Sequence, residues 1–418
     1  MSSTPAAPSR LARRLRLRDA VAIGLGAMVG AGIFAAVGPA AAAAGPALLA
    51  GLLLAAFVSW CNATSSAQLA ALHPASGGTY VYGRVRLGHY WGYLAGFGFV
   101  FGKLASCTAM ALTFGSYAAP SLARPLAAAA VIALTVLNYR GVQKTARATE
   151  AIVAVVVACL AAAVAAIWLG GSLDPARLAP APAHLDPRGI LQAAGLLFFA
   201  FAGYARIATL GEEVVDPART IPRAIPLALG IALAIYAIVL GSALLAVGAE
   251  ALAASPAPLA TAVEAGGQRW AAPVVRIGAA VASLGVLLSL IVGVSRTTFA
   301  MAAEGDLPRF LAAVHPRFRV PHRAEVAVGA IVASVVLVAD LREAIGFSSF
   351  AVLVYYGVAN AAALTLRREE RRWPRWIAAA GLACCALLAF SLPGASVIGG
   401  LILFAIASLA FVLTRRAR

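Results

Sequence analysis

Twelve apolar segments constrain the fold of this chain more than any other feature of its sequence. A segment of about 20 apolar residues crosses the hydrocarbon core of a bilayer as one α-helix. A water-soluble core could not bury so many of them, because 62% of the 418 residues are hydrophobic and only 12% are charged. We therefore predict an all-α polytopic membrane protein with 12 transmembrane helices, near residues 19–43, 46–70, 90–118, 121–139, 148–170, 189–212, 223–248, 271–302, 324–340, 343–365, 375–393 and 395–414.

Lysine and arginine residues are abundant in every second loop and scarce in the loops between. If the N-terminus is cytoplasmic, that side of the membrane holds 25 of the 33 basic residues and the other side holds five. Basic residues mark the cytoplasmic loops of membrane proteins. The pattern predicts a multi-pass protein of the cell (plasma) membrane with both termini cytoplasmic. The net charge of +17 is then a topology signal, and the lipid bilayer, not nucleic acid, is the expected partner.

Glycine weakens the first apolar segment in its middle. Residues 19–43 contain glycine at positions 24, 26, 30, 32 and 38, and each interior glycine costs a helix about 1 kcal/mol relative to alanine. We expect the helix to open at Gly30, Ala31 and Gly32. Backbone groups opened within the membrane must line a cavity and meet a polar ligand. The alternative is that Gly26 and Gly30, four residues apart, only let two helices pack closely.

The sixth apolar segment, residues 189–212, has a similar weak point at Phe201, Ala202, Gly203 and Tyr204. Five segments separate the two weak points, so the second helix enters the membrane from the opposite side. Any five-helix repeat that relates them must be inverted. Interrupted helices at matching positions of two inverted halves predict a transport site near the middle of the membrane.

Several motifs resemble those of the amino acid-polyamine-organocation (APC) superfamily of transporters, in particular its amino acid permeases. IGLGAMVGAGIF at 23–34 resembles the first helix, and FFAFAGYARIATLGEEVVDPARTIPRAIP at 198–226 resembles the sixth helix and the loop after it. Three further stretches fit in the same order, at 73–88, 138–150 and 295–309. The resemblance implies two inverted five-helix repeats with broken helices 1 and 6 and two extra helices. The expected units are a basic tail at 1–18, repeats at 19–170 and 189–365, and two additional helices at 375–414.

The resemblance also implies that the substrate lies between the two breaks, and the opened backbone groups suit an α-amino acid. The N–H groups at Gly30, Ala31 and Gly32 begin a half-helix whose positive dipole end favours a carboxylate. The carbonyl groups of Val29 and of the sixth helix from Phe199 to Ala202 would accept hydrogen bonds from the ammonium group. The expected substrate-binding residues are Val29, Gly30, Ala31, Gly32, Phe199, Ala200, Phe201, Ala202, Gly203 and Tyr204. Side chains expected to select the substrate are those of Ser106, Met110, Ala202, Tyr204 and Ala205.

Lys103 is the charged residue nearest the membrane centre and the candidate for energy coupling. No acidic residue lies in the core of a predicted span to pair with it, and burial disfavours its charged form, so it could load and release a proton. The alternative is a side chain that reaches water or backbone carbonyls. Many superfamily members carry a lysine at the position that aligns with Val156, where it replaces a sodium ion, and this chain does not. A sodium ion held by Ser283, Ser289, Ser295 and opened carbonyls of the first helix is the rival to the proton.

The remaining charged residues in or near the spans are expected in structural roles. Arg206 is predicted to reach the membrane surface or a nearby glutamate, and Arg276 is predicted to reach the opposite surface. Four charged residues after the sixth segment form a predicted cytoplasmic cluster: Glu212, Glu213, Asp216 and Arg219. Ion pairs within this cluster could act as a latch that holds the cytoplasmic side of the transporter closed.

A secondary transporter of amino acids, proton-coupled or exchanging, is the function that these features predict. No catalytic constellation is found, and the five cysteines lie in apolar segments without metal-binding spacing, so neither an enzyme nor a metal or cofactor is expected. A transporter of polyamines or other organic amines is the first alternative, although a polycation would require buried carboxylates. A membrane sensor that kept the fold without transporting is the second.

Overall fold

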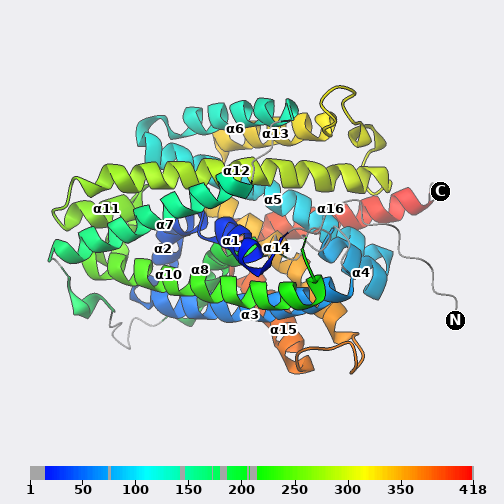
Figure 1. Ribbon diagram of the computed structural model, residues 1–418, viewed down its shortest axis with the longest axis horizontal. Helices are drawn as coiled ribbons and strands as arrows, with labels where there is room; N and C mark the ends of the chain where they lie inside the picture. The colour runs from blue at the N-terminus through cyan, green and yellow to red at the C-terminus, as the bar shows by residue number, and fades with distance from the viewer. Residues whose placement is uncertain are drawn as a thin grey trace.

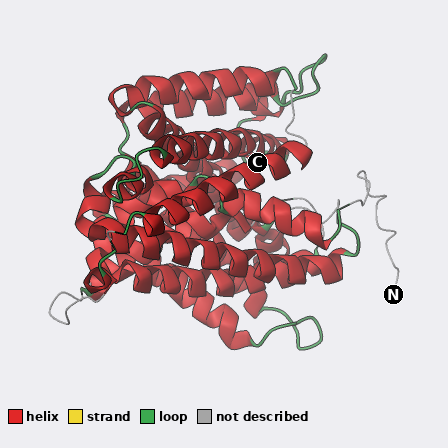
Figure 2. Ribbon diagram, turned by 60° about the vertical axis from the view of Figure 1, so that its left-hand side comes forward, coloured by secondary structure: helices red, strands yellow, loops and turns green. Residues whose placement is uncertain are grey.

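The computed structural model describes residues 15–73, 77–141, 146–171, 173–178, 186–204, 207 and 214–416, and its regular elements there are all helices (Figures 1 and 2). The one β-type contact among these residues is an isolated bridge between Leu15 and Val214. Eight helical stretches of the described chain are long and apolar enough to cross a membrane. They are Gly32–Leu72, His89–Ala118, Pro120–Tyr139, Ala148–Leu169, Pro217–Ala254, Ala271–Ala303, Leu341–Leu364 and Gly394–Thr414.

The difference between these eight stretches and the 12 predicted spans has identifiable causes. The first predicted span is divided into α1 (Leu17–Met28) and α2 (Gly32–Ala44), and α2 is followed by α3 (Leu48–Leu72) after the short turn at Gly45–Ala47. In the sixth, α8 (Pro187–Phe201) gives way to a 3-10 turn at Ala202–Tyr204. The ninth and eleventh are α13 (His322–Val338) and α15 (Arg375–Ser391), which have 17 residues each. Interruption and short length therefore reduce the number of long helices.

The other helices follow the predicted segments, with two short helices between them. The short ones are α4 (Thr79–Leu87), before the third span, and α11 (Pro258–Ala265), before the eighth. The spans themselves are α5 (His89–Ala118), α6 (Ala123–Tyr139), α7 (Ala146–Leu169), α10 (Pro217–Ala254), α12 (Ala271–Ala303), α14 (Leu341–Leu364) and α16 (Gly394–Arg416).

Small residues let α5 pack closely in the middle of the bundle, where it contacts both α12 and α14. A Cβ atom at Gly102 would lie 2.9 Å from the Cβ of Ala351 on α14. Close approach of this kind is the main source of helix association in a membrane, where burial of apolar surface gives little preference between lipid and protein. Helices α6 and α13 form a pair at one edge of the bundle, and α15 lies at the opposite edge (Figure 1).

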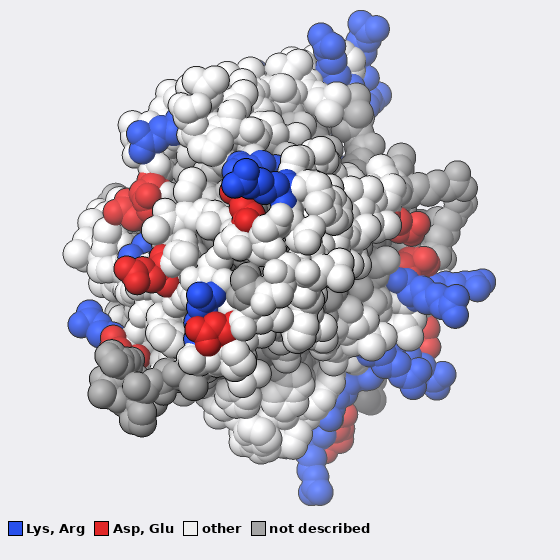
Figure 3. All heavy atoms as spheres, turned by 90° about the vertical axis from the view of Figure 1, so that its left-hand side faces the viewer, with Lys and Arg blue, Asp and Glu red and all other residues white. Residues whose placement is uncertain are grey.

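The two ends of the bundle carry the described ion pairs. Figure 3 shows the end with α11, where acidic and basic side chains lie beside one another on a mostly uncharged surface. At α11, Arg276 lies 3.7 Å from Glu264 and donates a hydrogen bond to the Tyr117 carbonyl at 3.3 Å. Arg276 thus joins α12 to α11 and α5.

At the other end, α4 is tied to neighbouring segments by charged groups. Arg84 pairs with Glu304 at 3.2 Å, and Arg86 makes a two-point contact with Glu370. Of the predicted latch, Asp216 and Arg219 form an exposed pair at 3.7 Å. Arg206, Glu212 and Glu213 lie outside the described residues.

Candidate functional site

The first break lies at Val29, Gly30 and Ala31, between α1 and α2. The last hydrogen bond of α1 runs from the Val29 N–H to the Leu25 carbonyl at 2.7 Å, and the next helical bond runs from the Ala35 N–H to the Ala31 carbonyl at 3.0 Å. Within the described chain, the intervening N–H groups, those of residues 30–34, have no acceptor. Unpaired N–H groups at a helix start attract anions, because they point outward and add to the positive end of the helix dipole.

The second break follows α8, whose last residue is Phe201. Asp186 caps the start of this helix by accepting hydrogen bonds from the N–H groups of Arg188 and Gly189 at 2.9 and 3.0 Å. At the other end, the Ala202 N–H donates to the Phe198 carbonyl, and the backbone then tightens into the 3-10 turn. The helix therefore ends inside the predicted span. Ala205, a predicted selectivity residue, lies outside the described residues.

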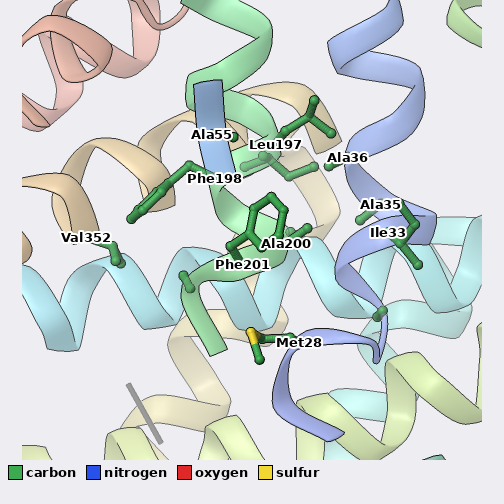
Figure 4. Packing of buried hydrophobic residues seen from close by; sticks show 14 of the residues in the cluster. Met28, Ile33, Ala35, Ala36, Ala55, Leu197, Phe198, Ala200, Phe201 and Val352 are labelled. Carbon is green, nitrogen blue, oxygen red and sulfur yellow. The ribbon is translucent and has the colours of Figure 1, made fainter. Parts of the chain in front are cut away.

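The two breaks lie directly against each other. A Cβ atom at Gly32 would lie 2.7 Å from the Ala200 Cα, and one at Gly203 would overlap the Ala27 carbonyl. Figure 4 shows the same neighbourhood, with Ala200 of α8 close to the chain between Met28 and α2. Gly32 and Gly203 thus permit close packing of the two breaks.

Tyr236 of α10 joins the two breaks. Its buried hydroxyl lies 2.6 Å from the Met28 carbonyl oxygen and 3.0 Å from the Ala200 carbonyl oxygen. The hydroxyl is therefore within hydrogen-bonding distance of one acceptor from each broken helix. The sequence analysis missed Tyr236. The signal available there was a tyrosine in the middle of a mostly apolar span, since a buried tyrosine hydroxyl usually has a hydrogen-bond partner.

The predicted selectivity residues lie on two elements, α5 and the turn after α8. Ala202 and Tyr204 lie at the second break, where the Tyr204 ring packs against the Tyr356 ring of α14 with centroids 5.1 Å apart. The Tyr204 hydroxyl is buried and interacts with the Tyr356 hydroxyl. Ser106, in contrast, shares a hydrogen bond with Ser348 of α14, with the two hydroxyl oxygens 2.7 Å apart. Met110 is 1% exposed on α5.

Lys103 is half-buried on α5. It forms no hydrogen bond or ion pair with any residue that the structure describes. Its neighbour one turn along, Cys107, is completely buried. Among the described residues, Lys103 therefore has no acidic partner.

A small cavity of about 10 Å³ lies behind the first break, between α1, α7 and α12. This is about the space that one water molecule needs. All of its lining residues are apolar: Gly26, Val29, Gly30, Ile152, Val153, Val156, Ala282, Gly285 and Val286. Val156 is thus part of this apolar lining.

The three serines proposed as sodium ligands do not line this cavity. Ser289 is exposed and donates to the Gly285 carbonyl, and Ser295 is buried and donates to the Ile291 carbonyl. Of these three serines, only Ser283 has a buried hydroxyl without a hydrogen-bond partner among the described residues. The three hydroxyls therefore do not meet at this cavity.

Comparison with known proteins gives one family. The amino acid permease family profile matches residues 15–414. An uncharacterised transporter of Mycobacterium tuberculosis is 61% identical over 98% of this chain and 94% of its own length.

Two more distant relatives come from Bacillus subtilis. A branched-chain amino acid permease is 27% identical over 94% of this chain and 86% of its own length, and a methylthioribose transporter is 28% identical over 97% and 94%. Both are therefore similar over nearly the whole fold. The chain belongs to the amino acid permease family of the APC superfamily and is a multi-pass membrane transporter, not an enzyme.

Proposed function

We propose that this transporter carries an amino acid whose carboxylate binds at the first break and whose amino group binds at the second. The observation that carries the proposal is the juxtaposition of the breaks, with Gly32 packed on Ala200. An α-amino acid places its two charged groups only a few ångströms apart, so one ligand can meet both breaks. The similarity to a branched-chain amino acid permease supports the same substrate class.

The carboxylate end of this proposed site is made of backbone donors. The N–H groups of residues 30–34 have no acceptor within the described chain, and hydrogen bonds from such groups to a charged ligand contribute about 1.5–3 kcal/mol each. Because backbone donors do not read the substrate side chain, they would bind the group common to all amino acids.

The amino end is made of carbonyl acceptors at Phe199, Ala200, Phe201 and Ala202, together with the Val29 carbonyl. Two of these already face tyrosine hydroxyls: Ala200 accepts from Tyr236 at 3.0 Å, and Ala202 lies 3.5 Å from the Tyr356 hydroxyl. An ammonium group would compete with these hydroxyls for the same oxygens. Binding would thus loosen the contact by which Tyr236 joins the broken helices.

Transport of a polycation such as a polyamine is less well supported. The described spans offer no carboxylate at either break, and a buried multiple positive charge needs such a partner. The residues at the breaks are valine, glycine, alanine, phenylalanine and tyrosine, which suit a ligand with one ammonium group.

For energy coupling we propose proton coupling through Lys103 or exchange of one amino acid for another, with both termini in the cytoplasm. The cavity next to Val156 has an apolar lining, and the exposed Ser289 is not part of that lining, which argues against a sodium ion there. Lys103 has no acidic partner among the described residues, and burial of a lysine favours the uncharged form of its amine.

Uptake by purified protein in proteoliposomes tests the proposal directly. Unlabelled neutral amino acids should compete with uptake of a labelled amino acid, whereas spermidine should not. Effective competition by spermidine and none by amino acids would support the organic-amine alternative. Absence of uptake and of exchange with every compound, from protein that retains a cooperative thermal transition, would support a sensor.

A further inference from the structure

The loop between α14 and α15 carries a concentration of positive charge that the transport site does not use. Five arginines and two glutamates lie between residues 367 and 375, here called the arginine loop. One of the glutamates, Glu370, already has partners, because it makes a two-point contact with Arg86 of α4 and accepts a hydrogen bond from the Arg367 N–H at 2.9 Å. The loop therefore presents a net positive charge to its surroundings.

Two guanidinium groups of the arginine loop are free. Arg368 and Arg372 are exposed, and their side chains make no hydrogen bond or ion pair with any residue that the structure describes. A guanidinium group is a planar fork of N–H donors that matches the oxygens of a phosphate. Arg368 and Arg372 thus offer two phosphate-binding groups without losing an existing contact.

The backbone of the loop is held in place by its other polar contacts. The Arg372 N–H donates to the Gln68 side chain of α3 at 3.3 Å, which fixes the loop against that helix. Arg375 donates to the Leu364 carbonyl at 3.0 Å, so the start of α15 is joined to the end of α14. The two free guanidinium groups therefore project from a loop whose position is defined, which lowers the entropy lost when a ligand binds.

Aromatic side chains lie next to the arginine loop on α3 and α15. Trp376, the second residue of α15, is 57% exposed, and its ring centroid is 6.4 Å from that of Trp60 on α3. The Trp60 ring is in turn 6.3 Å from that of Phe57, which is 40% exposed. Tryptophan favours the boundary between the hydrocarbon and the headgroups of a membrane. Because α15 lies at one edge of the bundle (Figure 1), this aromatic row faces the lipid.

The order of residues along α3 places the charges and the rings at different depths. Gln68, which contacts the arginine loop, is eight residues beyond Trp60, or about 12 Å at 1.5 Å per residue. On the other side of the contact, Arg372 precedes Trp376 by four residues. The guanidinium groups therefore lie toward the end of the bundle and the aromatic row lies deeper, the order in which a phospholipid presents its phosphate and its acyl chains.

We propose that the arginine loop and the aromatic row of Phe57, Trp60 and Trp376 bind an anionic phospholipid, with its phosphate on Arg368 and Arg372. Basic segments that directly adjoin a membrane helix attract anionic lipids. A zwitterionic lipid fits less well, because its headgroup carries a positive group that the remaining arginines repel. Glu369 is exposed but is outnumbered by the arginines around it.

A second basic loop provides a matched comparison within the same chain. Arg317 and Arg319 are also exposed, in the loop before α13, which lies at the opposite edge of the bundle from α15 (Figure 1). That loop contains no tryptophan, and the Arg317 guanidinium already lies over the Phe318 ring at 5.5 Å from its centroid. Removing two charges there tests whether the total charge of the protein matters or the place where the charges lie.

Lipid binding by the full-length protein in detergent tests the proposal without reference to transport. Delipidated protein is titrated with phosphatidylglycerol, with phosphatidylcholine or with inorganic phosphate. We expect phosphatidylglycerol alone to raise the thermal unfolding temperature and to remain bound in native mass spectrometry. Equal effects of the two lipids would overturn the proposal, and an equal effect of inorganic phosphate would assign the loop to a soluble anion.

Variants locate the bound lipid. The double variant Arg368→Gln, Arg372→Gln should weaken phosphatidylglycerol binding at least about tenfold, whereas Arg317→Gln, Arg319→Gln should not. Trp376→Ala should weaken binding of the lipid as well, although it changes no charge. All of these side chains are exposed, so the variants should keep the unfolding temperature of the lipid-free wild type. Equal losses in the two double variants would show a response to total charge, and the proposed site would be wrong.

Discussion

The two breaks differ in what they offer a ligand. At the first, the N–H groups of residues 30–34 have no acceptor in the described chain. At the second, the Ala200 carbonyl already receives the Tyr236 hydroxyl, and the Ala202 carbonyl faces that of Tyr356. A carboxylate would gain new hydrogen bonds at the first break, while an ammonium group would replace existing ones at the second.

This difference assigns separate roles to the two ends of the substrate. New charge-assisted bonds at the first break would provide most of the affinity, since each contributes about 1.5–3 kcal/mol. Exchange of one donor for another at the second break contributes less affinity, but it would disturb the Tyr236 contact between the broken helices. Substrate binding and the loss of this contact between the broken helices would thus be linked through the Tyr236 side chain.

The largest expected effect is that of Gly32→Val, which alters both breaks at once. Its side chain would overlap Ala200, and overpacking of this kind costs about 1–3 kcal/mol, so we expect uptake to fall below detection. Gly230→Val is the matched control, because a Cβ atom at Gly230 meets nothing within 4 Å. Wild-type uptake by the Gly32 variant, measured at equal amounts of reconstituted protein, would show that the close contact of the breaks is not needed.

Modified substrates separate the two ends. The methyl ester of the best amino acid should compete at least about tenfold less well than the acid, because it loses charge-assisted bonds at the first break. Acylation of the amine should also reduce competition, by removing the charge that the carbonyls bind. Competition assays in proteoliposomes give both values. If the ester competes as well as the acid, the first break does not bind the carboxylate.

Lys103→Ala tests whether coupling depends on a group that is part of neither break. For a proton carrier, we expect an inward-acid gradient to stimulate wild-type uptake several-fold with or without sodium, and Lys103→Ala to lose that stimulation while retaining exchange. Dependence on external sodium at fixed pH, with little effect of Lys103→Gln, would instead support a sodium site. Acceleration by internal amino acid alone would identify an exchanger in which Lys103 is structural.

Tyr236→Phe tests the competition proposed at the second break. Loss of the hydroxyl should lower the free energy of unfolding by about 1 kcal/mol, while the half-saturating substrate concentration should not rise, because the Ala200 carbonyl becomes free for the amine. Tyr90→Phe, which removes a hydroxyl bonded to Ser408 away from the breaks, is the control. A tenfold rise in half-saturation for Tyr236→Phe alone would mean that the hydroxyl itself binds substrate.

The smallest effect concerns pH and a contact outside the breaks. The Arg86 guanidinium holds the pKa of Glu370 at about 2, below its usual 4.5. Because the folded-state pKa is depressed, the stabilisation is complete above about pH 4.5 and is lost as the pH falls toward 2. The difference in thermal stability between wild type and Glu370→Gln should stay constant from pH 5 to 8. A difference that changes within that range would assign the pH dependence to another contact of Glu370.

Local sequence was sufficient to find the two interrupted helices. Glycine reduces helix stability wherever it occurs, so the spacing of Gly30 and Gly32 marked the first break, and a similar weak point around Gly203 marked the second. The lengths of the apolar segments likewise indicated where the chain crosses the membrane. Both properties, helix stability at glycine and the length of an apolar segment, depend on residues that are close together in the sequence. They can therefore be predicted without the tertiary structure.

Tertiary structure decided which side chains complete the site. Tyr236 and Met28 are 208 positions apart, and only the packing of α10 against both broken helices brings the hydroxyl to their carbonyls. The same holds for Arg276 with Glu264 and for Tyr139 with His322. A helix pattern shows which face is apolar, but the rotation and register of one helix against another depend on how side chains from distant segments fit together.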